Sequence, residues 1–346
     1  MTPTDAATGE DLLRRLWARG CDFLGTRTAI LGGAMSWVSE RHLVSAISNA
    51  GGFGVIACGS MDPDLLRTEI VATAALTDCP FGVNLITMHP VLDELIDVCL
   101  DEKVSHVVLA GGLPRSAQIA RIKDGGAKVM CFAPALAFAR KLVRSGADAL
   151  IIEGMEAGGH IGPVSTSVLA QEILPHIDDV PVFVAGGIGH GEAVAAYLDM
   201  GASGCQLGTR FVCAEESIAH PAFKKRFLRA QARDAQVSPQ LDPRFPVIPV
   251  RALANAASER FLDVQRQVIA KVEAGELDQK AAQLEVERFW VGALRRAVID
   301  GDIDNGSVMA GQSVGMVRSE QPLAEIIGEL VTQAADALAR RDQVRP

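Results

Sequence analysis

Residues 180–189 read Val-Pro-Val-Phe-Val-Ala-Gly-Gly-Ile-Gly. The stretch is a short apolar run that ends in three glycines within four positions. Such a run is typical of a strand buried on both faces, as in a parallel sheet. The glycines allow the backbone a tight turn directly after the strand. The fold then depends on how often this pattern recurs along the chain.

Short apolar runs occur eight times, with helical periodicity in most of the intervals. Strands that alternate with helices pair in parallel through right-handed crossovers, which leaves an open doubly wound sheet or a closed barrel. Eight units favour the α/β class and the (β/α)8 TIM barrel. The predicted strands lie near residues 28–32, 53–57, 80–85, 105–110, 127–132, 148–152, 180–185 and 203–207.

Signals at helix starts agree with this alternation. Thr8 and Asp11 have the spacing of a capping box before a short first helix. Ser39 precedes an apolar helical pattern as a candidate N-cap, and Asp62-Pro63 opens another helix.

Residues 217–300 interrupt the pattern with long charged stretches, and we expect helices over 260–275 and 278–296. We therefore expect residues 1–216 to form the main part of the barrel and 217–300 a helical insertion or lid after the eighth strand. Residues 301–346 return to the barrel and end in an amphipathic closing helix over 323–338.

Composition excludes several classes of function. The chain of 346 residues has 33 Lys and Arg against 42 Asp and Glu, a net charge of −9, and no basic run that could follow a nucleic-acid backbone. Its seven cysteines form no Cys-x-x-Cys pair and are expected to be reduced, in a cytoplasmic protein. We expect neither a membrane span nor a metal site, because no long apolar run and no ligand spacing is present.

The two last predicted strands are followed by glycine-rich loops. Ala185, Gly186 and Gly187 follow the seventh strand, and Gly208 and Thr209 follow the eighth. These are the loops with which a TIM barrel commonly binds phosphate through backbone amides. The alternative is that the glycines only make tight turns. Neither a Rossmann fingerprint nor a P-loop is present.

Residues 151–163, after the sixth strand, contain four glycines around one imidazole, that of His160. Histidine exchanges a proton near neutral pH, so at this end of a barrel it is a candidate catalytic residue. A cap or a plain surface residue is the alternative. For Glu153 and Glu156 we expect loop anchoring or a contact with a helix terminus rather than acid-base chemistry.

Seven ordered motifs together resemble the nitronate monooxygenase family, formerly 2-nitropropane dioxygenase. The similarity is greater still to its relatives, the flavin-type enoyl-acyl carrier protein reductases. The motifs span residues 33–38, 49–54, 80–84, 153–162, 185–188, 206–211 and 306–312.

The resemblance implies a TIM barrel that binds FMN without a covalent bond, with His160 as the active-site histidine. One departure is Gly32-Gly33-Ala34-Met35, where the family usually has Gln-Gly-Gly-Met or Gln-Gly-Pro-Met, which puts one polar contact in doubt. The implied cofactor-binding residues are Gly33, Met35, Asn84, Glu153, Gly158, Gly159, Ala185, Gly186, Gly187, Gln206, Gly208, Thr209, Met309 and Gln312.

The resemblance leaves the reaction open. Oxidation of alkyl nitronates with O₂ ranks narrowly above FMN-dependent enoyl reduction, with NAD(P)H as the reductant, and above NADH:quinone reduction. A non-catalytic flavin-binding protein is a further alternative. The expected partners are a small substrate, a nitronate or an enoyl thioester, and a second copy in a homodimer. An acyl carrier protein would need a basic surface, for which residues 224–233 offer a candidate helix face, although a solvated face is the simpler interpretation.

Overall fold

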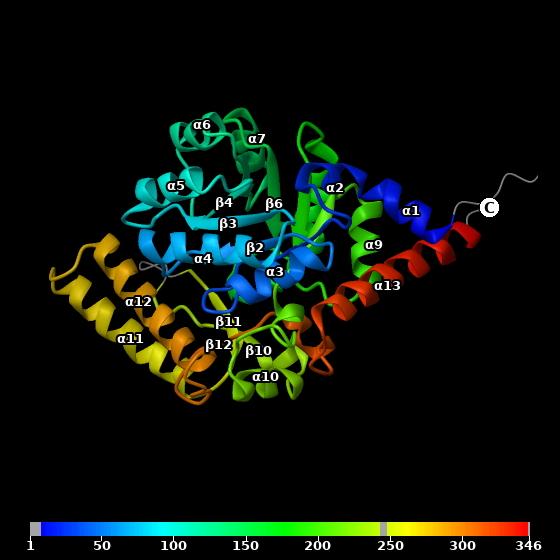
Figure 1. Ribbon diagram of the computed structural model, residues 1–346. Coiled ribbons are helices and arrows are strands. Elements are labelled where there is room, and N and C mark those ends of the chain that lie inside the picture. Colours follow the sequence, from blue (N-terminus) through cyan, green and yellow to red (C-terminus); the bar gives the residue numbers. More distant parts are fainter. Residues whose placement is uncertain (1–7, 243–247, 345–346) are drawn as a thin grey trace, which may run out of the picture.

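The computed structural model describes residues 8–242 and 248–344. Its centre is a sheet of eight parallel strands in the order β1-β9-β8-β6-β5-β4-β3-β2 (Figure 1). The strands are β1 (Ile30–Gly32), β2 (Gly54–Ala57), β3 (Phe81–Ile86), β4 (His106–Ala110), β5 (Lys128–Phe132), β6 (Ala149–Glu153), β8 (Val182–Ala185) and β9 (Gly204–Leu207).

The two outer strands, β1 and β2, meet and close the sheet. Leu31 and Phe53 form a parallel bridge. The Gly32 amide donates to the Phe53 carbonyl at 2.9 Å, and the Phe53 amide donates to the Ile30 carbonyl at 2.9 Å. The fold is therefore a (β/α)8 TIM barrel, and the eight predicted strands are confirmed.

Helices surround the barrel, and α13 packs along α9 beside the N-terminal α1 (Figure 1). At Gly191 a Cβ atom would lie 2.0 Å from the Leu330 carbonyl oxygen, so this packing requires glycine. The helices are α1 (Gly9–Leu16), α2 (Ala18–Leu24), α3 (Arg41–Asn49), α4 (Pro63–Leu76), α5 (Leu92–Asp101), α6 (Ser116–Asp124), α7 (Leu136–Arg144), α8 (Thr166–Ile173), α9 (Gly191–Asp199) and α13 (Leu323–Val344).

Two of the three predicted helix starts are confirmed. Thr8 and Asp11 form the capping box of α1. The Asp62 carboxylate accepts from the Leu65 amide at 2.8 Å, with Pro63 as the first residue of α4.

The predicted cap at Ser39 is wrong. Glu40 caps α3 by accepting from the amide of His42. The Ser39 hydroxyl instead accepts from the Met35 amide and donates to the Gly33 carbonyl, each at 3.0 Å. A serine before an apolar pattern can bond backward as well as forward, and here it fixes the loop after β1.

The segment after β9 contains strands as well as the predicted helices. β10 and β11 were not predicted, and they form a small antiparallel sheet with β12 across one end of the barrel, while the α11–α12 hairpin projects to one side (Figure 1). The hairpin has a core of its own around Phe261 and Trp290. The elements are α10 (Pro221–Leu228), β10 (Ala235–Val237), β11 (Val250–Leu253), α11 (Ala256–Glu273), α12 (Gln279–Val298) and β12 (Val308–Met309).

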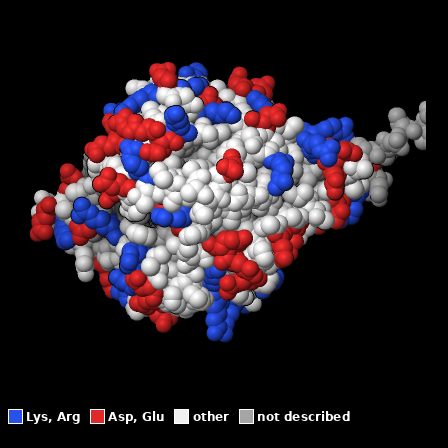
Figure 2. All heavy atoms as spheres, in the orientation of Figure 1, with Lys and Arg blue, Asp and Glu red and all other residues white. Residues whose placement is uncertain are grey.

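Charges of both signs are interspersed over the visible face (Figure 2). Lys224, the first residue of the predicted basic face on α10, is buried. It donates to the Ala214 carbonyl at 2.8 Å and pairs with Glu320 at 3.3 Å. Lys224 therefore stabilises the fold and adds nothing to a landing surface. Over the described ranges, every helix is too short or too polar to cross a membrane.

Candidate active site at the barrel mouth

The small sheet joins two of the predicted site segments. β7 (Gly159–His160) leaves the loop after β6 and pairs with β11 beside β12. His160 lies opposite Val250, and Met309 lies opposite Ala252. Residues about 150 positions apart in sequence, those of β7 and β12, are thus placed end to end along one edge of β11. We call β7, β11 and β12 together the mouth sheet.

Glycines make this junction possible. A Cβ atom on Gly158 would lie 2.5 Å from the Gly311 amide nitrogen, closer than such contacts occur. Gly159 has φ +74°, in the left-handed region, and the Met309 sulfur would lie 3.5 Å from a Cβ atom there. Both predicted glycines are therefore required by the backbone path itself.

His160 is exposed at the edge of the mouth sheet. Residues directly opposite in a strand pair project to the same side, so its ring shares a side with Val250. Val250 packs into the core of the α11–α12 hairpin. The imidazole therefore lies where the hairpin approaches the barrel mouth, accessible to a small molecule.

The loop before β7 is anchored by Glu156. Its carboxylate accepts from the backbone amide and the hydroxyl of Thr166, both at 2.9 Å, at the N-terminus of α8. Its carbonyl accepts from the Gln312 amide at 2.9 Å. The expected contact with a helix terminus is confirmed for Glu156, and negative charge is favourable at that end of a helix.

The two predicted phosphate loops lie side by side, because β8 pairs with β9. Gly186 and Gly187 have φ of +97° and +71°. Over the described ranges the amides of Gly186, Gly187, Gly208 and Thr209 donate no hydrogen bond to the protein. The Thr209 hydroxyl accepts from the Gly311 amide at 2.9 Å. Four unused donors at adjacent strand ends suit a phosphate.

Three polar side chains lie on strands that end at the mouth. Asn84 and Gln206 are buried at 6% and 7% exposure, and the Asn84 amide donates to the Val108 carbonyl at 3.1 Å. No described residue pairs with the Asn84 side-chain oxygen, the Gln206 amide or the Glu153 carboxyl. None of these atoms is among the fully buried unpaired atoms of the described residues, so they remain accessible and have hydrogen-bonding capacity left for a ligand.

Glu153 points into the barrel. A Cβ atom on the next residue, Gly154, would meet Thr166 of α8, which is outside the barrel. Successive residues of a strand point to opposite faces, so the carboxyl group of Glu153 faces inward. Burial raises the pKa of Glu153 to about 8, because the charged form loses its hydration. The group is therefore protonated at neutral pH and able to donate a hydrogen bond.

Two methionines complete the predicted set. The Met35 sulfur lies 3.4 Å from the position of a Cβ atom on Gly208, and a Cβ atom on Gly33 would lie 3.5 Å from the Gln206 side chain. Met35 and Gly33 are thus grouped with the loop after β9, while Met309 is grouped with Gly159. The arrangement suits a ligand with a phosphate at one end and a flat polar ring at the other.

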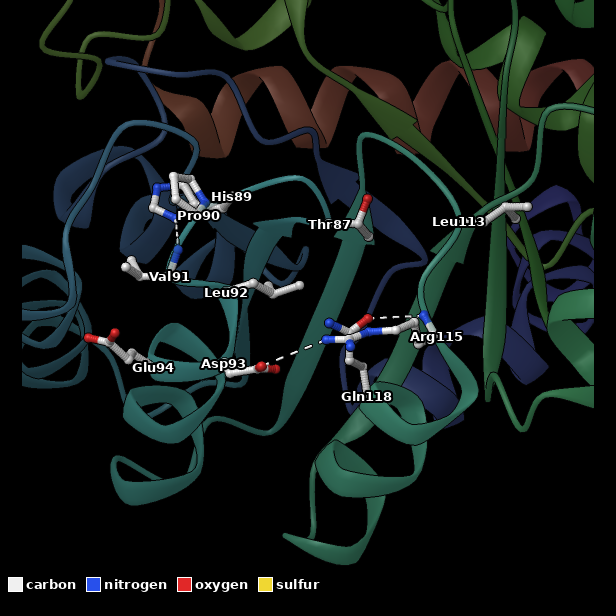
Figure 3. A pocket seen from close by; sticks show the side chains of 10 residues that line it. All are labelled: Thr87, His89, Pro90, Val91, Leu92, Asp93, Glu94, Leu113, Arg115 and Gln118. Atoms are coloured by element: carbon white, nitrogen blue, oxygen red, sulfur yellow. Dashed lines mark hydrogen bonds and ion pairs between the residues drawn. The ribbon is translucent and has the colours of Figure 1, made fainter. Parts of the chain in front are cut away.

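A separate hollow of about 470 Å³ opens at the rim, between the loop after β3 and the loop after β4 (Figure 3). Arg115 and Asp93 approach to 3.7 Å within it, and the His89 ring accepts from the Val91 amide at 3.4 Å. None of the predicted site residues lines it. One of its lining residues, Thr87, lies three positions after Asn84 in the sequence.

The fold is a TIM barrel with unpaired backbone amides at the ends of β8 and β9 and an exposed histidine on the mouth sheet. The chain belongs to the nitronate monooxygenase family, whose model matches residues 19–95 and 88–333.

Three relatives show the range within the family. The chain is 30% identical to the (3aS,4S,5R,7aS)-5-hydroxy-7a-methyl-1-oxo-octahydro-1H-indene-4-carboxyl-CoA dehydrogenase of Mycobacterium tuberculosis, over 90% of this chain and 94% of that protein. It is 27% identical to a nitronate monooxygenase of Paraburkholderia phytofirmans, over 92% and 96%. FabK from Thermotoga maritima matches with a TM-score of 0.84 and 36% identity, over 94% of this chain and 99% of that chain. The chain is an enzyme of the oxidoreductase class.

Proposed function

We propose that the protein is an FMN-dependent oxidoreductase that acts on acyl thioesters, exchanging hydrogen across the Cα–Cβ bond. The observation that supports FMN is the set of four unpaired amides at the ends of β8 and β9, beside the unpaired polar layer of the mouth. When bound, FMN supplies the redox chemistry, as hydride or single-electron transfer.

Each group of residues has a defined task in this proposal. The amides of the two glycine loops bind the phosphate. Asn84 and Gln206 would hydrogen-bond the ring, and protonated Glu153 would donate to it. Met35 and Met309 would provide polarizable contacts. The α11–α12 hairpin and the mouth sheet limit the access of water.

His160 is the proposed proton carrier. In the reducing direction NAD(P)H is the electron source, the β-carbon of the enoyl thioester gains a hydride, and the α-carbon gains the proton that His160 donates. In the oxidising direction the same ring takes the α-proton, and the hydride that leaves the β-carbon would pass to bound FMN. A positioned acid or base of this kind contributes about 10² to 10⁴ in rate.

The choice of a thioester rests on similarity within the family. The motifs at 153–162 and 306–312 resemble the reductase branch, and the relative at 30% identity carries a coenzyme A thioester in its name. This reverses the order that the sequence alone favoured.

Nitronate oxidation is the second candidate, supported by the family model and by the relative at 27% identity. In that reaction the anionic substrate is already deprotonated, so His160 would hold the nitro group rather than move a proton.

Parallel anaerobic mixing separates the candidates. Protein with bound FMN is mixed with NADH, NADPH, a saturated acyl-CoA or propionate 3-nitronate, and bleaching of the flavin absorbance is followed. We expect bleaching by a nicotinamide or an acyl-CoA. Bleaching by nitronate alone would establish the second candidate, and a purified protein that takes up no FMN would refute both.

A further inference from the structure

We propose that Arg251, in strand β11 of the mouth sheet, is a positioning residue that sets the place of His160. The inference rests on the proposed function for the role of His160, but its structural part can be measured without turnover.

Arg251 contacts the His160 loop twice. Its backbone lies opposite Gly159 in the β11–β7 pair. Its side chain reaches the start of the same turn, where Nε donates to the Met155 carbonyl at 2.9 Å. One residue thus holds the turn at two points four residues apart, immediately before His160.

The other side of the guanidinium is fixed to the insertion. Nη1 donates to the Ala235 carbonyl of β10 at 2.5 Å, and the side chain is 3% exposed. A planar guanidinium donates in fixed directions, so the distance between β10 and the turn is determined by the side chain itself. A charged group is buried only where its donors are satisfied, which indicates that this linkage forms whenever the insertion is folded.

The Arg251 side chain therefore links three elements: the turn before His160, β10, and β11, to which Arg251 belongs. The Glu156 carboxylate links the turn to α8, and the backbone amide of Gln312 links the turn to the segment after β12. These contacts fix the turn relative to the barrel, whereas the β7–β11 backbone pairing and the Arg251 side chain fix β7 relative to the insertion. His160 lies at the meeting point, so its position depends on both.

Hydrogen exchange tests the structural part. In Arg251→Met, the amides of residues 155–162 should exchange at least 10-fold faster than in the parent protein. Arg266→Met is the matched control, since Arg266 lies on the same insertion and pairs with Asp263 at an exposed site, and it should leave these amides unchanged. Exchange that stays the same in Arg251→Met would overturn the proposal.

A double-mutant cycle tests the functional part. We expect Arg251→Met to lower kcat about 10-fold or more, with bound FMN retained, and to lower it less than twofold in a His160→Asn background. Equal losses in both backgrounds would show that Arg251 acts independently of His160 and would reject the positioning role.

If Arg251→Met does not fold, Arg251→Lys provides a second test of the same proposal. A single ammonium retains the charge but cannot donate along both directions, so the same faster exchange is expected. If His160→Asn itself leaves kcat unchanged, the proposed function fails, and the exchange result still decides the role of Arg251.

Discussion

The two ends of the site are built in different ways. The proposed phosphate end consists of the loops after β8 and β9, which are adjacent strands of a regular barrel, and each loop follows its strand directly. The His160 end is assembled from β7, β11 and β12, short strands distant in sequence. The first end needs only a closed barrel, whereas the second also needs the insertion to fold. We therefore expect substitutions at the first end to affect cofactor binding and those at the second to affect turnover.

The largest expected effect is at the His160 end. His160→Asn should lower kcat about 10² to 10⁴-fold, because it removes the proton carrier, while the visible spectrum of bound FMN stays unchanged. Steady-state kinetics with flavin content measured on the same sample checks this. Loss of the flavin together with activity would show that the two ends are not separate.

The next effect is at the phosphate end. Gly186 has φ +97°, and a Cβ atom there would lie 2.8 Å from the Thr166 hydroxyl and 2.9 Å from the Gly154 carbonyl oxygen. Gly186→Val should cost about 1–3 kcal/mol for the backbone conformation alone and weaken FMN binding at least 10-fold. Gly162→Ala is the control, since nothing lies within 4 Å of its Cβ position. Equal FMN affinity in both variants would contradict the assignment.

Glu153 should make the free energy of unfolding depend on pH. Its pKa, about 8 in the folded protein against 4.5 ordinarily, means that the folded state holds a proton that the unfolded chain has lost. The stabilisation of the folded protein by the proton on Glu153 is complete below about pH 4.5 and is lost as the pH rises through about 8.

Glu153→Gln should therefore be more stable than the parent at pH 9, by on the order of a few kcal/mol, and nearly equal to it at pH 4.5. Urea unfolding of flavin-free samples at both pH values measures the difference. A constant difference between the two pH values would show that the carboxyl group is ionised throughout.

The smallest expected effect lies outside both ends. Arg115→Ala removes the cation of the rim hollow (Figure 3). If a long thioester extends along this rim, KM for an acyl-CoA should rise about threefold, roughly 0.7 kcal/mol. KM for a thioester truncated to N-acetylcysteamine should stay unchanged. Initial rates with both substrates check this, and equal changes would assign Arg115 to the stability of the rim.

The parts of the site that follow the barrel strands could be predicted from sequence. An apolar run followed by Gly186-Gly187 or by Gly208-Thr209 carries its own signal, and strand order then places the two loops together. Asn84, Glu153 and Gln206 lie at or near the ends of such runs, but only the resemblance to the family indicated them as site residues.

The mouth sheet could not be predicted from sequence. β7 is only Gly159–His160, and β10 and β11 have three and four residues in a charged segment where helical signals dominate. Nothing in the local sequence distinguishes Arg251 from the exposed arginines nearby. The burial of Lys224 could not be predicted either. Lys224 lies in a basic run that is typical of an exposed helix face, but it is buried and pairs with Glu320.

By itself the sequence determined the eight-stranded barrel, the glycine loops at the ends of β8 and β9, and the presence of a histidine beyond β6. Local patterns are sufficient there, because burial and turn formation depend on neighbouring residues. Only the tertiary structure decided where His160 stands, which segments lie beside it and that burial raises the pKa of Glu153. Those properties depend on pairing and burial between segments far apart in the chain, for which a local pattern carries no signal.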